Sequence, residues 1–341
     1  MKNINIGIIG YGRIGAEHAG WLRRAIGIGD ISVADPTPAR LAIAESKGLV
    51  TFSDFELLLT DRSIDAILVS TPTAMHFEHA SQALSAGKHV MIEKPMALDM
   101  EQSQRLIKQA SSSNKLLSVF HNRRWDIDFL TVRQAIESNT FGRIINIESR
   151  ISQWASCVGP AAREYRPNWR NEASYGGGGL YDWGSHLIDQ MWQLMLPAEP
   201  VRVFAQLRGN VWSKDCDDFA RICIDFDHGA VGMVEINTTT THSLPRWHID
   251  GALGSAEAPA SLKYDTREWA QLQFRPADGS DQRILPIAPV GLTEPEIWSR
   301  FASSIHGDGE PAVTVKTVLQ TMRLIDAARQ SSEKGIAVAI D

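Results

Sequence analysis

The feature that most constrains this chain is a glycine-rich turn near its N-terminus, set between a strand-like run and a helix-like run. Residues 4–9 are an apolar run of buried-strand length, and Gly10-Tyr11-Gly12-Arg13-Ile14-Gly15 follows directly. A second apolar run, residues 31–34, ends in Asp35, twenty residues beyond Gly15. An isolated G-x-G-x-x-G is a weak pattern, but strand, glycines, helix, strand and acid in this order are typical of a dinucleotide-binding unit. The alternative is a glycine turn in an unrelated α/β protein.

Each glycine of this turn has a separate physical task. Gly10 permits the tight turn, Gly12 lets the backbone approach a pyrophosphate, and Gly15 lets the helix pack closely on the strand. The N–H groups of the helix then face the phosphates. Asp35 should accept hydrogen bonds from the adenosine ribose, which favours NAD, whereas nearby Arg13 and Arg40 can reach the extra phosphate of NADP. We therefore predict NAD as cofactor, with NADP possible.

The first third of the chain alternates between strand-like and helix-like segments. Buried-strand runs at 64–70, 89–92 and 116–120 alternate with helical patterns at 76–86 and 100–111. Alternation at this spacing predicts a parallel, doubly wound sheet, which is the Rossmann arrangement. We expect residues 1–121 to form an NAD(P)-binding Rossmann domain of the α/β class.

Beyond residue 121 the pattern changes to strands in which apolar and polar residues alternate. Runs at 145–148, 201–204, 222–226 and 231–236 predict half-buried antiparallel strands, and a helix is expected over 181–196. A chain of 341 residues is long enough for two cores. The prediction is a second, α+β domain over 122–341 with a large, mostly antiparallel sheet. Its position after the nucleotide-binding part suits a substrate-binding domain, and the apolar face of its sheet needs cover, which suits oligomerisation.

Composition narrows the class of protein. A hydrophobic fraction of 43% with 22% charged residues is that of a soluble globular chain, and a net charge of −6 argues against nucleic acid or an anionic membrane as partner. No apolar run reaches the ~20 residues of a membrane span. The three cysteines have no C-x-x-C spacing, so we expect neither a disulfide framework nor a cysteine metal site. These properties favour a cytoplasmic protein.

Polar residues follow two of the predicted parallel strands, at the edge where a nicotinamide should lie. Ser70-Thr71-Pro72 and His76 come after one strand, and Glu93-Lys94-Pro95 after the next. Pro95 restricts the backbone of Lys94, and a lysine held near a cleft suits proton exchange with a hydroxyl or carbonyl group; otherwise it is a solvated surface residue. The predicted cofactor-binding residues are Gly10, Tyr11, Gly12, Arg13, Ile14, Gly15, Asp35, Arg40, Ser70, Thr71, Pro72, His76, Glu93 and Lys94.

A second polar cluster follows a run of four glycines, residues 176–179. On the helix expected there, Asp182, His186 and Asp189 stand at i, i+4 and i+7, which places them on one face. A carboxylate and an imidazole at this spacing fit three alternative roles, which are an acid/base pair, two metal ligands and a helix-capping arrangement. Metal binding needs a third ligand that the sequence does not identify, so no metal is predicted.

Three motifs together resemble the Gfo/Idh/MocA family, the glucose–fructose oxidoreductase and inositol dehydrogenase type. They are the glycine loop, Glu93-Lys94-Pro95, and the glycine run with Asp182-x-x-x-His186. The resemblance spans nearly the whole chain and implies that Lys94, Asp182 and His186 form the catalytic group. It is strongest to the branch that contains scyllo-inositol dehydrogenases. The chain departs from that branch at Arg13-Ile14 and at Trp183-Gly184-Ser185, so a sugar or polyol is better supported than inositol itself.

The segments that flank this group are rich in arginine and aromatic residues, which match the hydroxyl edges and apolar faces of sugars. For any single aromatic residue, a place in the core or at a subunit contact is the alternative. The predicted substrate-binding residues are Lys94, Asn122, Arg123, Arg124, Trp154, Tyr165, Trp169, Arg170, Asp182 and His186.

The resemblance implies hydride transfer between NAD(P) and a secondary alcohol or carbonyl carbon of a sugar, sugar derivative or cyclic polyol. His186 would take the hydroxyl proton, Lys94 would stabilise the alkoxide or relay the proton, and Asp182 would orient its partner; which of Lys94 and His186 is the proximal base stays open. The alternatives are a lyase or epimerase that uses tightly bound NAD transiently, and a non-catalytic nucleotide-sensing regulator. A homodimer or homotetramer formed through the C-terminal sheet is also implied.

Overall fold

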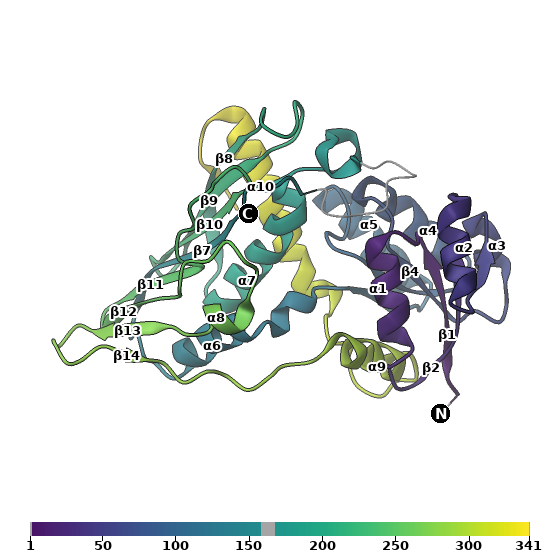
Figure 1. Cartoon of the computed structure of the whole chain (residues 1–341), viewed down its shortest axis with the longest axis horizontal. Helices are drawn as coiled ribbons and strands as arrows, with labels where there is room; N and C mark the ends of the chain where they lie inside the picture. Colours follow the sequence, from purple (N-terminus) through teal and green to yellow (C-terminus); the bar gives the residue numbers. More distant parts are fainter. Residues whose placement is uncertain (1, 158–167, 341) are drawn as a thin grey trace.

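The computed structural model describes residues 2–157 and 168–340, and within them the N-terminal part is a parallel sheet flanked by helices (Figure 1). Its strands are β1 (Ile4–Ile9), β2 (Ile28–Ala34), β3 (Val50–Phe52), β4 (Ala66–Val69), β5 (His89–Ile92) and β6 (Leu117–Val119). The helices between them are α1 (Arg13–Leu22), α2 (Pro38–Ser46), α3 (Phe55–Thr60), α4 (His76–Ser85) and α5 (Met100–Ser112).

The strand order of this sheet is β3-β2-β1-β4-β5-β6, and every neighbouring pair is parallel. The order reverses between β1 and β4, which places the glycine turn after β1 beside the polar turn after β4. Ligands of doubly wound sheets bind at such a switch point. The predicted Rossmann fold is confirmed, and the short strand β3 at the sheet edge is an addition to the prediction.

The C-terminal part is built on a larger sheet, with α7 and α10 lying along one side of it (Figure 1). Among the described residues its strand order is β14-β13-β12-β11-β7-β10-β9-β8-β15. These strands are β7 (Ile144–Ser152), β8 (Pro200–Arg208), β9 (Phe219–Phe226), β10 (Val231–Asn237), β11 (Trp247–Gly251), β12 (Gly254–Glu257), β13 (Gln273–Pro276), β14 (Arg283–Ile284) and β15 (Val338–Ala339). The helices are α6 (Ile127–Glu137), α7 (Ser185–Met195), α8 (Thr266–Trp269), α9 (Glu294–Ile305) and α10 (Val315–Lys334).

One pair of strands in this sheet differs from the antiparallel pairing that the sequence predicts. β7 and β10 are parallel, in register from Asn146 opposite Val231 to Ser152 opposite Asn237. The other pairs of this sheet are antiparallel, so the sheet is mixed but mostly antiparallel. Alternating burial reveals which residues face the core, but it carries no information on strand direction.

Helix α9 lies next to α1 in the packing, although it belongs to the C-terminal half of the sequence (Figure 1). Its residues Ile297, Trp298 and Phe301 share one apolar cluster with Ile6 and Leu22 of the nucleotide-binding fold. In the parts of the chain that the structure describes, no helix is long and apolar enough to cross a membrane.

Candidate active site

A cavity of about 880 Å³ runs from the glycine turn to the start of α7. It is lined at one end by Gly10, Gly12 and Asp35, and at the other by Lys94, Asp182 and His186. Two motifs that are far apart in the sequence therefore face the same cavity. Its size falls within the range of natural ligand sites.

The backbone of the glycine turn has the geometry that a dinucleotide requires. Gly10 has a φ of +94°, and a Cβ added at Gly15 would stand 2.1 Å from the Gly10 carbonyl oxygen. A Cβ at Gly12 would meet only Arg40 Nη1, at 4.0 Å, so this position is open to a bound group. The three glycines fit the turn, the close packing and the phosphate approach that the pattern predicts.

Asp35 lies at the end of β2 with both carboxylate oxygens engaged. Oδ2 accepts the backbone N–H of Tyr11 at 2.7 Å, and Oδ1 accepts that of Thr37 at 2.8 Å. Arg40 Nη1 lies 3.5 Å from Oδ2. Asp35 therefore holds the glycine turn in place as well as facing the cavity, and it does so beside a guanidinium.

Most of the residues predicted to bind the cofactor line the cavity. Ser70 Oγ donates to the Gly10 carbonyl oxygen at 2.8 Å, which ties together the two turns of the switch point. Tyr11 and Gly15 do not line the cavity themselves. Tyr11 donates its backbone N–H to Asp35, and Gly15 lacks the side chain that would collide with the Gly10 carbonyl oxygen. The predicted residues in the lining are Gly10, Gly12, Arg13, Ile14, Asp35, Arg40, Ser70, Thr71, Pro72, His76, Glu93 and Lys94.

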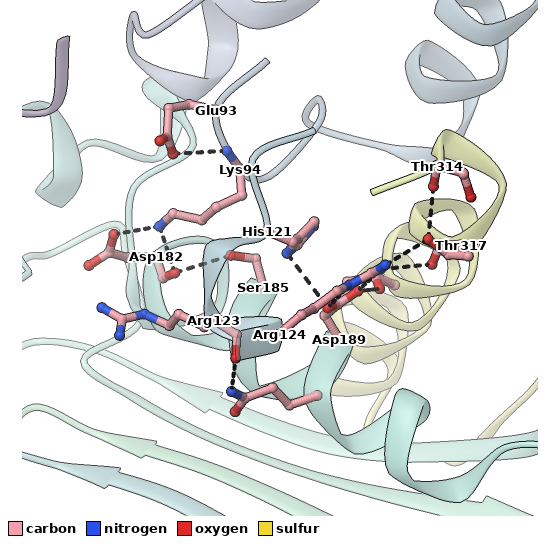
Figure 2. Close-up of polar contacts among 12 residues, drawn as sticks. Glu93, Lys94, His121, Arg123, Arg124, Asp182, Ser185, Asp189, Thr314 and Thr317 are labelled. Carbon is pink, nitrogen blue, oxygen red and sulfur yellow. Dashed lines mark hydrogen bonds and ion pairs between the residues drawn. The ribbon is translucent and has the colours of Figure 1, made fainter. Parts of the chain in front are cut away.

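Lys94 and Asp182 meet at the other end of the cavity (Figure 2). Lys94 Nζ is 3.2 Å from Asp182 Oδ1, and Arg170 Nε lies 3.4 Å from the same oxygen. Burial alone would raise the pKa of Asp182, but Lys94 and Arg170 outweigh it and hold that pKa at about 2. Asp182 is therefore a carboxylate at neutral pH.

His186 lines the same end of the cavity and is almost fully buried. Its Nδ1 has no hydrogen-bond partner among the described residues. Burial, reinforced by the charge of Lys94, holds the pKa of His186 well below its ordinary value. At neutral pH it is an unprotonated imidazole that can accept a proton.

The helix expected over 181–196 begins as a π-helical turn, Leu180–Gly184, which continues into α7. Asp189 lies on α7, but its carboxylate is bound by Arg124 through Nε and Nη2, both at 2.7 Å, and by the Thr321 hydroxyl at 2.9 Å (Figure 2). Arg124 was predicted to bind substrate, and the structure places it outside the cavity lining because Asp189 and Thr317 engage its guanidinium. Within the described residues, no group of three His, Cys, Asp or Glu side chains is placed to hold a metal ion.

The other residues predicted to bind substrate have three different outcomes. Asn122, Arg123, Trp169 and Arg170 line the cavity. Trp154 does not, since its ring packs edge-on against Trp212 at 5.3 Å and is 55% exposed. Tyr165 falls outside the described residues.

Sequence reasoning missed a wall of the cavity formed by residues from four separate segments. The guanidinium of Arg123 lies 4.3 Å from the ring centre of Tyr264 and 4.8 Å from that of Trp183. Asp126 accepts from the Tyr264 hydroxyl at 2.5 Å, and burial raises the pKa of this carboxyl to about 7. Trp183 was noticed only as a departure from the family pattern. The residues of this wall that sequence reasoning missed are Asp126, Trp183, Tyr264, Thr266 and Glu294.

Two family models match this chain, one in each half of the sequence. Residues 4–121 match the family described as "Oxidoreductase family, NAD-binding Rossmann fold", and residues 129–257 match the "GFO/IDH/MocA C-terminal domain".

Similar proteins have related descriptions. Scyllo-inositol 2-dehydrogenase (NADP(+)) IolW of Bacillus subtilis is 27% identical, over 100% of this chain and 97% of its own length. Levoglucosan dehydrogenase of Pseudarthrobacter phenanthrenivorans is 27% identical, over 86% of this chain and 82% of its own. The crystal structure of an NAD-binding protein from Listeria innocua superposes with a TM-score of 0.88 at 30% identity, covering 99% of this chain and 97% of that one.

Proposed function

This chain belongs to the Gfo/Idh/MocA family of NAD-binding oxidoreductases, and we propose that it moves a hydride between NAD(P) and a secondary alcohol or carbonyl carbon of a sugar, sugar derivative or cyclic polyol. One observation carries the proposal. Lys94, Asp182 and His186 line the same cavity as the glycine turn, so a proton-handling group faces the place where a dinucleotide would end.

In this proposal the bound dinucleotide supplies the hydride acceptor or donor, and the side chains handle the proton. His186 is unprotonated at neutral pH because its pKa is lowered by burial and by Lys94, so it takes the hydroxyl proton during oxidation. Lys94 is paired with Asp182, and its ammonium group stabilises the developing alkoxide. Asp182 holds Lys94 in place through its backbone oxygen and its carboxylate.

The substrate class is supported by the lining and by the relatives. Trp169 and Trp183 offer flat apolar faces, while Asn122 and Arg170 offer hydrogen-bonding groups, a combination that suits a polyhydroxylated ring. Relatives named for scyllo-inositol, levoglucosan and 1,5-anhydro-D-fructose all act on compounds of this kind.

The test is a screen of the purified protein against cyclic polyols, aldoses and anhydrosugars with NAD and with NADP, followed by the absorbance of the reduced nicotinamide. Net reduction that depends on one sugar or polyol supports the proposal. A new product without net reduction would instead indicate a lyase or epimerase. Tight dinucleotide binding with no product from any substrate would indicate a regulator.

We also propose a homo-oligomer assembled through the C-terminal sheet, acting in the cytoplasm. Phe204 of β8 and Val231 of β10 are 41% and 36% exposed, on the face of the sheet turned away from the buried residues Val203 and Ala205. Exposed apolar side chains on a sheet face favour a second subunit as cover. The three cysteines are free, which suits a reducing compartment.

A further inference from the structure

A chain of buried hydrogen bonds leads from α9 to the peptide of Lys94. Trp298 Nε1 donates to His18 Nδ1 at 3.0 Å, and His18 Nε2 lies 2.8 Å from Glu93 Oε1. The other carboxylate oxygen of Glu93 accepts the backbone N–H of Lys94 at 3.1 Å. Trp298 and His18 are fully buried, and Glu93 is 7% exposed where it lines the cavity. Four residues from three distant parts of the sequence thus form one continuous path.

The direction of each hydrogen bond follows from the groups involved. An indole N–H can only donate, so His18 Nδ1 must offer its lone pair. The single proton of a neutral imidazole then resides on Nε2, which donates to the Glu93 carboxylate. Trp298 therefore selects one of the two histidine tautomers, in the way that a partner on one ring nitrogen fixes the role of the other.

This arrangement has a consequence for the cavity. Glu93 carries its charge at the cavity wall, next to the residue whose ammonium faces Asp182. Burial raises the pKa of Glu93, but the hydrogen bond from His18 and the charge of Lys94 outweigh it and keep that pKa below its ordinary value. Both oxygens of the Glu93 carboxylate accept a hydrogen bond, one from His18 and one from the Lys94 N–H. These two bonds fix the orientation of the carboxylate and of the Lys94 peptide.

We propose that Trp298, His18 and Glu93 are positioning residues for Lys94: the indole N–H fixes the tautomer of His18, which anchors the Glu93 carboxylate against the Lys94 peptide. The inference rests on the proposed function, since it assigns a purpose to the position of Lys94. Neither His18 nor Trp298 belongs to the three motifs by which the chain resembles its family.

The surroundings of this path are apolar on one side and ionisable on the other. His18 packs edge-on against the rings of Trp21, Phe120 and Trp298, at 4.8, 4.4 and 5.6 Å between ring centres. Lys94, His76 and His121 are the other ionisable groups whose charges interact with Glu93. Burial lowers the pKa of both His76 and His121, the latter to about 4, so neither places a charge beside the Glu93 carboxylate at neutral pH.

The test is Trp298→Phe, which keeps an aromatic ring but removes the donor to His18 Nδ1. In the parent protein, NMR of the labelled histidine rings should give a single Nε2–H tautomer for His18. In the variant, Nδ1 has lost its donor and can carry the ring proton itself, so the spectrum should show a mixture of the two tautomers. In the Nδ1–H tautomer His18 cannot donate to Glu93, so kcat should fall about tenfold, the scale of one lost charge-assisted hydrogen bond.

Two further variants separate positioning from packing. In Trp298→Phe combined with His18→Gln, the amide can donate to Glu93 whatever residue occupies position 298, so kcat should recover toward the parent value. Phe301→Leu, at a fully buried neighbour that packs edge-on against Trp298, should lower the melting temperature and leave the His18 tautomer unchanged. An unchanged His18 tautomer in Trp298→Phe, or a kcat that stays low in the double variant, would overturn the proposal. The NMR measurement needs no turnover, so a failure of the proposed reaction is distinguishable from a failure of this inference.

Discussion

Lys94 and Asp182 lie 88 residues apart in the chain, yet Lys94 Nζ donates both to the backbone oxygen of Asp182, at 3.0 Å, and to its Oδ1, at 3.2 Å. The lysine follows β5 of the parallel sheet, and the aspartate stands in the π-helical turn before α7. The contact joins the two halves of the molecule at the point where we propose the chemistry takes place.

If this group acts on the proton, Lys94→Ala and His186→Ala should each lower kcat about a hundredfold, the scale of lost acid–base catalysis. Affinity for the dinucleotide should change much less than kcat, because most of its proposed contacts lie elsewhere, at the glycine turn, Asp35 and the turn after β4. Steady-state kinetics together with titration of NADH fluorescence measure both quantities. Retained kcat in both variants would remove the assignment.

Asp182→Asn keeps the shape of the side chain but removes the charge that faces Lys94 and Arg170. It should lower kcat while the melting temperature stays close to that of the parent, since the amide oxygen can still accept from Lys94. A lower melting temperature with normal turnover of the folded fraction would instead assign Asp182 a structural role.

Cofactor choice should depend on the balance between Asp35 and Arg40 at the end of β2. We expect NAD to be preferred, and Arg40→Ala to weaken NADP further by about tenfold, the value of one charge-assisted hydrogen bond. The ratio of kcat/KM for the two cofactors measures this in parent and variant. If the parent protein preferred NADP, Arg13 and Arg40 would contribute more to cofactor choice than Asp35 does.

The glycine run before Asp182 should tolerate no side chain at Gly178. Its φ is +103°, and an added Cβ would lie 2.3 Å from Asp217 Oδ1. Gly229 is the matched control, with a φ of +89° and no atom within 4 Å of an added Cβ. Gly229→Ala should cost about 1–2 kcal/mol of unfolding free energy from backbone strain alone. Gly178→Ala should cost more and also lower kcat, as measured by denaturant unfolding and turnover.

Asp217 should make the protein less stable as the pH rises. Burial raises the pKa of this carboxyl to about 6, while its Oδ2 accepts the N–H of Leu180 at 2.8 Å. Between about pH 4 and 6 the folded state binds more protons at this group than the unfolded state, so its contribution to stability falls with rising pH. Relative to the parent, Asp217→Asn should therefore gain stability between those pH values. A difference that is constant with pH would contradict the shift.

The sheet face that carries Phe204 should be an interface between copies of the chain. Light scattering at micromolar concentration should give the mass of a dimer or tetramer, and Phe204→Lys should reduce it. Ile26→Lys, which changes an apolar side chain that is 83% exposed outside the sheets, should not. A monomer mass for the parent protein would contradict the assembly.

Local sequence patterns were sufficient to predict site residues whose conformation depends only on their own segment of the chain. The turn at Gly10, the lysine after β5 and the polar residues at the start of α7 were all placed by sequence reasoning and all line the cavity. Helix α9 was missed, although Thr293 and Glu296 form a capping box, which is a sequence signature of a helix start.

Long-range partners could not be predicted in this way. Arg124 was assigned to substrate because arginine suits a sugar, but the carboxylate that engages it stands on α7. Tyr264 reaches the cavity from a segment between β12 and α8 with no strand or helix of its own. Trp154 looked equivalent to Trp169 in sequence, and only the packing of Trp212 distinguishes them. In each case the deciding contact is with a residue about 50 or more positions away.

The placement of α9 also bears on how the protein is synthesised. Trp298 and Phe301 complete an apolar cluster with Ile6, Ile8 and Leu22, so the nucleotide-binding fold lacks part of its core until residues near the C-terminus have emerged from the ribosome. A nascent chain, or a fragment that stops at residue 121, exposes that surface to other chains. Production of the first domain alone should therefore require α9 to be supplied with it.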